Sequence, residues 1–109
     1  MPYSVFACFQ AAEKKFDLEF EFGLATPDCV ERDPIVLTNG QFPGPTLTVN
    51  VGDLVTVNVR NRLHSVAVNV HFHGVHQRGT PWSDGATYYN SCPVSPVQLY
   101  VLCLYVVDC

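Results

Sequence analysis

Alternation of apolar and polar residues limits what this chain can fold into more than any other feature of its sequence. In KKFDLEFEFGL, apolar side chains recur at every second position from Phe16 to Leu24, and charged residues fill most positions between them. Successive side chains on a β-strand point to opposite faces, whereas a helix of this sequence would mix both kinds of side chain on each face. The segment Phe16 to Leu24 is therefore predicted to be a half-buried strand.

The same period recurs further along the chain. Leu47 to Val51 and Val55 to Val59 alternate on either side of a Gly52-Asp53 turn, which predicts two adjacent antiparallel strands. Val66 to Phe72 continues the pattern, and the short run IVLT predicts a further strand. From the first predicted strand onward, no stretch longer than about ten residues has apolar residues at helical spacing. Several short strands between Pro/Gly turns such as NGQFPGPT predict an all-β sandwich or barrel.

Composition and charge narrow the functional classes. The chain has 109 residues, of which 48% are hydrophobic and 15% charged, and this predicts a single globular domain. Its net charge is -4 and its basic residues are scattered, so we expect no nucleic-acid partner. The apolar run VQLYVLCLYVV is shorter than the roughly 20 residues that cross a membrane as a helix, so it is interpreted as a strand or a tail. The N-terminal MPYSVFACFQAAEKK lacks the basic start of a signal peptide.

The five cysteines leave two interpretations open. One is an oxidising compartment, in which the odd number leaves at least one thiol without a partner in the chain. The other is that free cysteines are buried as small apolar residues. The sequence does not determine their pairing, and it contains no C-x-x-C pair that would indicate a zinc knuckle or a thioredoxin-type site.

Three of the four histidines fall within the short stretch HFHGVH. If the alternation continues from Val66 to Phe72, His71 and His73 lie on the face opposite the apolar residues, roughly 6.6 to 6.8 Å apart along the strand. Two imidazoles at this spacing can reach one metal ion or two neighbouring ions, and copper, zinc, iron and nickel all accept imidazole. Solvated histidines on a polar strand face are the alternative. For His64 and His76, a surface position is the better interpretation.

The motifs around this stretch occur in a fixed order: NGQFPGPTLTVNVGDLVTVNVRN, then VHFHGVHQRGTPWSDG, then SCPV. From about Ile35 to Val94 they resemble the first cupredoxin (plastocyanin-like) domain of multicopper oxidases of the laccase and ascorbate oxidase type. The resemblance implies a cupredoxin-like Greek-key β-sandwich with copper as the cofactor. It divides the chain into an N-terminal segment (1–14), a cupredoxin-like domain (15–96) and a divergent tail (97–109) that truncation or read-through would explain.

The resemblance also implies roles for individual residues. His71 corresponds to a ligand of the mononuclear type 2 copper and His73 to a ligand of one type 3 copper, in the trinuclear cluster that reduces dioxygen to water. Asp84 corresponds to a carboxylate that assists proton delivery, which makes it the catalytic candidate; a plain Asp-Gly turn is the alternative. Trp82 is expected to be a packing residue.

The chain departs from the family after Pro96. It contains one of the four histidine motifs of a complete enzyme, and none of its cysteines has the neighbouring histidine that a type 1 copper site needs, which argues against a small electron-transfer cupredoxin.

A complete copper-dependent oxidoreductase would require the missing cupredoxin domains, dioxygen and a small reductant such as a phenol, and by resemblance it would be secreted. The reductant itself is not determined by this sequence. We expect the isolated chain to be inactive. A non-catalytic β-sandwich binding module and a non-functional fragment are the alternatives.

Overall fold

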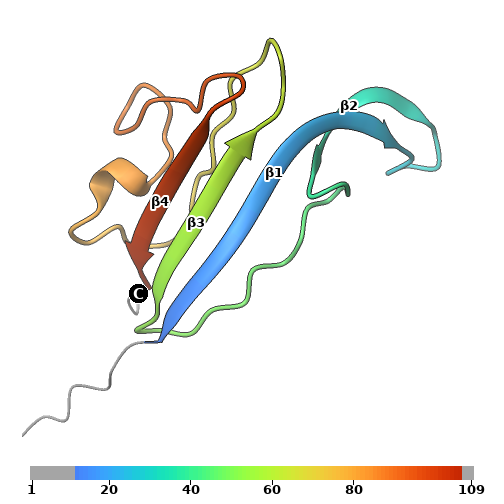
Figure 1. Ribbon diagram of the computed structural model, residues 1–109. Coiled ribbons are helices and arrows are strands. Elements are labelled where there is room, and N and C mark those ends of the chain that lie inside the picture. The colour runs from blue at the N-terminus through green and yellow to red at the C-terminus, as the bar shows by residue number, and fades with distance from the viewer. Residues whose placement is uncertain (1–11, 107–109) are drawn as a thin grey trace, which may run out of the picture.

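The described part of the chain forms one mixed four-stranded sheet. The computed structural model describes residues 12–106. The strands β1 (Glu13–Ala25), β2 (Arg32–Thr38), β3 (Leu54–Asn61) and β4 (Leu99–Tyr105) lie in the order β2-β1-β3-β4 (Figure 1). Within these residues the only helical element is the short 3-10 turn η1 (Pro81–Ser83). The all-β prediction is confirmed.

The strands predicted from alternation at the start of the chain and after Asp53 are β1 and β3, and IVLT lies within β2. The parallel register of β1 with β3 places Leu18 beside Val59, and the antiparallel register of β3 with β4 places Val57 beside Leu102. Because the side-chain period of every strand is two, the apolar residues of all three strands share one face. Leu18, Val57 and Leu102 are buried there, and this face is the core of the molecule.

β1 pairs with different strands along its length. Residues Glu13 to Phe20 run parallel to β3, and the part from Phe20 onward pairs antiparallel with β2. Figure 1 shows that this second part and β2 reach past the end of β3. Its apolar side chains are consequently poorly covered, with Phe22 43% and Leu24 58% exposed.

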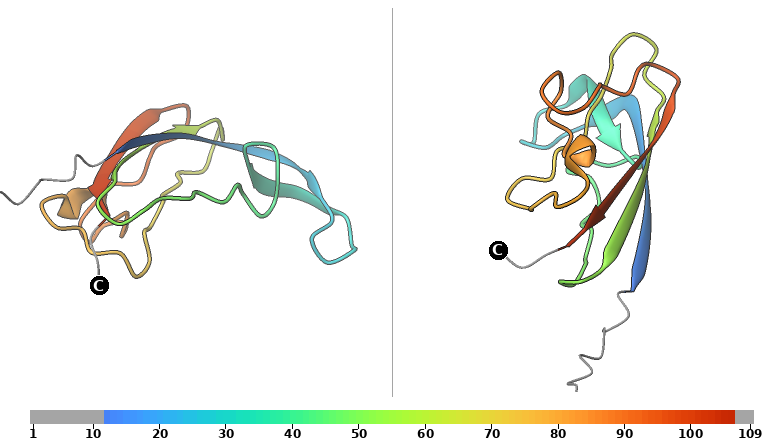
Figure 2. Two further views of the ribbon diagram at one scale, coloured as in Figure 1. Left: turned by 90° about the horizontal axis from the view of Figure 1, so that it is seen from below. Right: turned by 90° about the vertical axis from the view of Figure 1, so that its left-hand side faces the viewer.

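Two of the predicted strands, Leu47 to Val51 and Val66 to Phe72, are not strands in the structure, so that prediction is wrong. The second makes a single isolated bridge, in which Val68 and Val94 exchange two backbone hydrogen bonds of 3.1 and 2.8 Å. The alternation nevertheless indicates the correct buried side, because apolar residues of both segments pack against the core: Leu47, Val49, Val68, Val70 and Phe72. Figure 2 shows the two segments lying across one face of the sheet.

The predicted antiparallel pairing around Gly52 and Asp53 is also wrong, since the neighbours of β3 are β1 and β4. The turn is tied to the end of β4: the Gly52 amide donates to the Val106 carbonyl, and the Val106 amide donates to the Asp53 carbonyl. The carboxylate of the buried Asp53 accepts a 2.8 Å hydrogen bond from the backbone amide of Asn50. The turn therefore carries the chain from the covering layer into the sheet, and the two flanking segments never pair.

The apolar run after Pro96, for which strand and tail were both open, forms the edge strand β4. Leu102 and Leu104 in this strand are only 1% and 2% exposed, so it contributes directly to the core. The division of the chain at residues 96 and 97 stays a prediction. No helix within residues 12–106 has the length and hydropathy needed to cross a membrane.

The turn that leads into β4 contains an unfavourable residue. The backbone amide of Gln98 donates a 3.2 Å hydrogen bond to the Ser95 carbonyl, and Val97 has φ +62°. With Pro96 at the second position, these are features of a type II β-turn. The residue with positive φ in such a turn is normally glycine, because a β-branched side chain crowds the backbone there. Val97 is 74% exposed, so its side chain gains little packing in return.

Replacing Val97 with glycine is expected to stabilise the protein by about 1 kcal/mol, because relief of the left-handed conformation exceeds the extra flexibility of glycine in the unfolded chain. Guanidinium unfolding followed by circular dichroism measures this. The matched control is Val101→Gly, which removes another exposed valine, at 48% exposure, from a regular part of β4 and should destabilise. A loss of stability in Val97→Gly would contradict the prediction.

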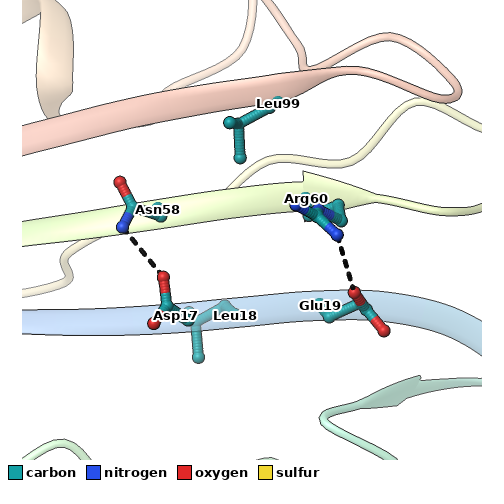
Figure 3. Close-up of a pocket in the computed structure, with 6 residues that line it drawn as sticks. All are labelled: Asp17, Leu18, Glu19, Asn58, Arg60 and Leu99. Carbon is teal, nitrogen blue, oxygen red and sulfur yellow. Dashed lines mark hydrogen bonds and ion pairs between the residues drawn. The ribbon is translucent and has the colours of Figure 1, made fainter.

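The outer face of the sheet is polar. Asn58 Nδ2 donates to Asp17 Oδ1 at 2.8 Å, and Arg60 and Arg62 form ion pairs with Glu19 at 3.8 and 2.8 Å. The hydrogen bond from Arg62 to Glu19 raises the pKa of the guanidinium. Figure 3 shows the pairs Asn58–Asp17 and Arg60–Glu19, whose residues line a hollow of about 480 Å³. Each of these charged groups has a partner across the sheet, so the arrangement is that of a solvated stabilising surface.

Candidate metal centre

The two histidines with metal-ligand spacing lie side by side in the covering layer. The ring centroids of His71 and His73 are 5.8 Å apart, with an angle of 41° between the ring planes. Phe72 between them packs against the core. Both histidines are exposed, so the two imidazoles lie on the solvent side of the segment although it is not a strand.

A hydrogen bond defines which nitrogen of His71 can bind a metal ion. His71 Nδ1 lies 2.8 Å from the backbone carbonyl oxygen of Asp84. Because a carbonyl oxygen only accepts hydrogen bonds, Nδ1 must be the donor, and the lone pair of the neutral ring is then on Nε2. A backbone carbonyl that holds one ring nitrogen while the other is free to coordinate is the usual arrangement around metal-binding histidines.

The side chain of Asp84 lies at the same place. Its Oδ1 is 3.5 Å from His71 Nδ1, and its Oδ2 accepts a 3.1 Å hydrogen bond from Asn90 Nδ2. The Asp84 side chain is 22% exposed, compared with 49% for His71. The structure therefore brings His71, His73 and Asp84 into one region, and the acid is shielded from water more than the imidazole beside it.

The loop that carries Asp84 is fastened to the histidine segment by close backbone packing and by a side chain. Asn69 Nδ2 donates to the Gly85 carbonyl at 2.5 Å and to Thr87 Oγ1 at 2.6 Å. Gly85 has φ +80°, and a Cβ atom at this position would overlap the carbonyl oxygen of Val70. Only glycine fits there. Because Gly85 has no Cβ atom, the loop comes close enough for the Asp84 carbonyl to reach the ring of His71.

The described residues supply an incomplete ligand set. Within residues 12–106, no group of three or more His, Cys, Asp or Glu side chains is arranged to hold a metal ion. His64 lines a separate hollow with Glu21, Phe22 and Arg62, and His76 is exposed beyond Gly74. The part of the chain that the structure describes thus places two imidazoles, those of His71 and His73, side by side.

The structure also tests the expectation for Trp82 and one of the two interpretations of the cysteines. Trp82, which was expected to be a packing residue, is 57% exposed and lines an open hollow with Tyr88, Tyr89 and Tyr100. Cys29 and Cys92 are free and exposed, and Cys103 is free and half-buried, so burial as small apolar residues does not describe the first two. Cys8 and Cys109 lie outside the described residues.

Sequence reasoning missed the residues that position the candidate ligands. Asn69, Gly85 and Asn90 carry no metal-binding chemistry of their own, and none was singled out. For Gly85, its place in an Asp-Gly pair is the only signal in the sequence, and it indicates a turn without revealing the close approach to Val70. For Asn69 and Asn90, the partners lie many residues away or within an irregular loop, where no periodicity applies.

Comparison with known proteins gives matches over most of the chain. The sequence pattern of the family described as multicopper oxidase matches residues 19–108. The chain is 44% identical over 86 residues to an L-ascorbate oxidase of Cucumis sativus, which covers 79% of this chain and 14% of that protein. It is 38% identical over 87 residues to the iron transport multicopper oxidase FET3 of Gibberella zeae, covering 80% of this chain and 14% of that protein.

Structural comparison leads to the same group of proteins. The laccase from Botrytis aclada superposes with a TM-score of 0.83 at 28% identity, over 88% of this chain and 18% of the laccase chain. The chain spans only 14% to 16% of the length of the first curated relatives that it matches.

Proposed function

We propose that this chain, which belongs to the multicopper oxidase family, is the amino-terminal copper-binding domain of a laccase-like oxidase and contributes His71 and His73 to a trinuclear copper cluster that reduces dioxygen to water. Its fold is the all-β, cupredoxin-like fold of that family, and copper is the family's cofactor. The observation that carries the proposal is the hydrogen bond from His71 Nδ1 to the Asp84 carbonyl, which leaves Nε2 available beside the ring of His73.

The residues present fit copper. Imidazole nitrogen is a ligand that copper accepts readily, and two rings with centroids 5.8 Å apart can serve one ion or two adjacent ions. When bound, copper supplies the electron transfer to dioxygen. The residues of this chain hold the ligands in place: the Asp84 carbonyl orients His71, and Phe72 anchors the segment in the core.

Asp84 is proposed to move protons, because reduction of dioxygen to water consumes protons as well as electrons. Its Oδ2 accepts a hydrogen bond from Asn90, whereas Oδ1 lies 3.5 Å from His71 Nδ1. A carboxylate oxygen in this position can accept a proton from solvent and release it on the side of the loop where His71 and His73 lie. The partial burial of the side chain keeps it directed at the site.

The finer parts of the function rest on the family. The relatives carry different functional names, L-ascorbate oxidase and iron transport multicopper oxidase among them, so the reductant is proposed only as a small molecule of phenolic or similar type. The remaining copper ligands and the site that accepts electrons are assigned to further cupredoxin domains of a complete oxidase. A secreted location is proposed on the same basis. A non-catalytic cupredoxin-like module is the alternative, and the incomplete ligand set within residues 12–106 favours it for the isolated chain.

Copper binding by the isolated chain tests the proposal. We expect weak but specific uptake, because two imidazoles leave the ion largely hydrated, and no sustained oxygen consumption with a phenol. The double variant His71→Ala, His73→Ala should abolish the specific uptake, measured by copper titration with calorimetry and paramagnetic resonance. His64→Ala is the matched control, since that exposed histidine lines another hollow.

Two results would contradict the assignment. Equal loss of copper uptake in His64→Ala would show that the site is elsewhere. Copper uptake that survives in the double histidine variant would favour the alternative of a module whose metal binding does not involve this pair.

A further inference from the structure

We propose that Asn90 is a positioning residue, which fixes the carboxylate of Asp84 and through it the orientation and tautomer of His71. Neither the motif comparison nor the copper assignment involves Asn90. The effect on His71 is a property of this loop alone, and only its consequence for copper binding rests on the proposed function.

The side chain of Asn90 is held at both ends. Its Oδ1 accepts a 3.2 Å hydrogen bond from the Ala86 amide, and its Nδ2 donates to Asp84 Oδ2 at 3.1 Å. The backbone amides of Tyr89 and Asn90 both donate to the Ala86 carbonyl, at 3.0 and 3.1 Å, so the loop closes on itself. Because the Ala86 amide needs an acceptor and the Asp84 carboxylate needs a donor, the orientation of the Asn90 amide follows from its two partners.

The two oxygens of Asp84 then have different surroundings. With Oδ2 attached to Asn90, the carboxylate cannot rotate freely, and Oδ1 remains 3.5 Å from His71 Nδ1. The Asp84 carbonyl lies 2.8 Å from the same nitrogen. Two acceptors at one ring nitrogen favour the tautomer that carries its proton on Nδ1, and this leaves the Nε2 lone pair unprotonated.

Asn90 acts by attraction, because its Nδ2 is a donor facing an acid. Replacing the Asn90 amide with a carboxylate of the same size turns this attraction into repulsion, because two carboxylates then face each other. The expected result is that the Asp84 carboxylate moves away from Asn90, so that Oδ1 no longer lies 3.5 Å from His71 Nδ1. The Asp84 carbonyl alone then stabilises the Nδ1-protonated tautomer, which is populated less.

The test compares Asn90→Asp with the control Asn58→Asp. Asn58 also donates its Nδ2 to a carboxylate, Asp17 Oδ1 at 2.8 Å, but on the outer face of the sheet, so both variants make the same chemical change. The readout is the ring nitrogen chemical shifts of His71 in the metal-free full chain, at a pH well above the ordinary histidine pKa of about 6.5, where the ring is neutral. We expect the ratio of Nδ1-protonated to Nε2-protonated ring to fall about three- to tenfold in Asn90→Asp and to stay unchanged in Asn58→Asp.

A second variant covers failure of the first to fold. Asn90→Ala removes the donor without adding charge and should shift the tautomer ratio in the same direction by a smaller amount, with amide spectra showing that the sheet is intact. An unchanged ratio in both Asn90 variants, or an equal shift in Asn58→Asp, would overturn the inference. If the wild-type chain takes up no copper while the tautomer shift is observed, the proposed function fails and the positioning role stands.

Discussion

Replacing Gly85 with alanine is expected to destabilise the protein by about 3 kcal/mol or more. The residue has φ +80°, which costs an alanine about 1 to 2 kcal/mol, and the new Cβ would overlap the backbone oxygen of Val70 and approach His71 Cα to 3.0 Å. Since neither obstacle is the end of a flexible side chain, the loop must move, and overpacking of this kind costs about 1 to 3 kcal/mol in addition. The same displacement takes the Asp84 carbonyl away from His71.

Gly79 provides the matched control. Its φ is +75°, and nothing lies within 4 Å of the position that a Cβ would occupy. Gly79→Ala therefore has the same backbone cost without the overlap, and we expect a loss of only about 1 to 2 kcal/mol. Guanidinium unfolding followed by circular dichroism measures both. Equal losses in the two variants would show that the close approach to Val70 is unimportant.

Replacing Asn61 with alanine is expected to cost about 3 kcal/mol or more. Asn61 is 0% exposed at the end of β3, and its side chain makes three hydrogen bonds to the backbone. Nδ2 donates to the carbonyls of Val66 and Val94 at 2.8 and 3.0 Å, and Oδ1 accepts from the Leu63 amide at 2.9 Å. Alanine leaves all three groups without this partner, and the bonds to Val94 and Leu63 are buried, where each unsatisfied group costs about 1 to 3 kcal/mol.

The control for Asn61 is Asn58 on the same strand. Its amide donates to the carboxylate of Asp17 on the exposed outer face, where water replaces the lost partner. We expect Asn58→Ala to change the free energy of unfolding by less than about 1 kcal/mol. Thermal unfolding of both variants gives the comparison. A cost for Asn61→Ala no larger than that for Asn58→Ala would mean that the three backbone groups find other partners.

The contrast between these asparagines shows where sequence reasoning stops. Both lie in the stretch NVRN, where alternation places Asn61 on the same side as the buried Val57 and Val59, and Asn58 on the opposite side. Alternation does not reveal the hydrogen-bond partners of Asn61, because Val94 lies 33 residues further along the chain, beside Val68 in an isolated bridge. Alternation predicted the strands that contain Phe16 and Val57 because each strand packs one face against the core.

Where alternation failed on pairing, it still indicated which side of each segment is covered, although Val51 and Val66 at the segment ends are exposed. Leu47 and Phe72 point to the core as their period indicates, but a period of two reports only which side of an extended chain is covered. Pro43 and Pro45 precede the first of these segments and lack amide donors, which disfavours a ladder there. For the candidate site, alternation placed His71 and His73 on one side. The contacts of Asp84 and Asn90 depend on loop geometry that no periodic pattern describes.

The divided pairing of β1 has a consequence for the order in which the protein can fold. Its second part pairs with β2 across a short connection, so the chain loses little conformational entropy when this hairpin closes. Its first part runs parallel to β3, from which it is separated by the whole of β2 and a long irregular segment. Non-local contacts of this kind form late, because the closure entropy is lost before they stabilise anything. During synthesis, therefore, Phe16 and Leu18 stay uncovered until β3 has been made, and β4 completes the sheet last.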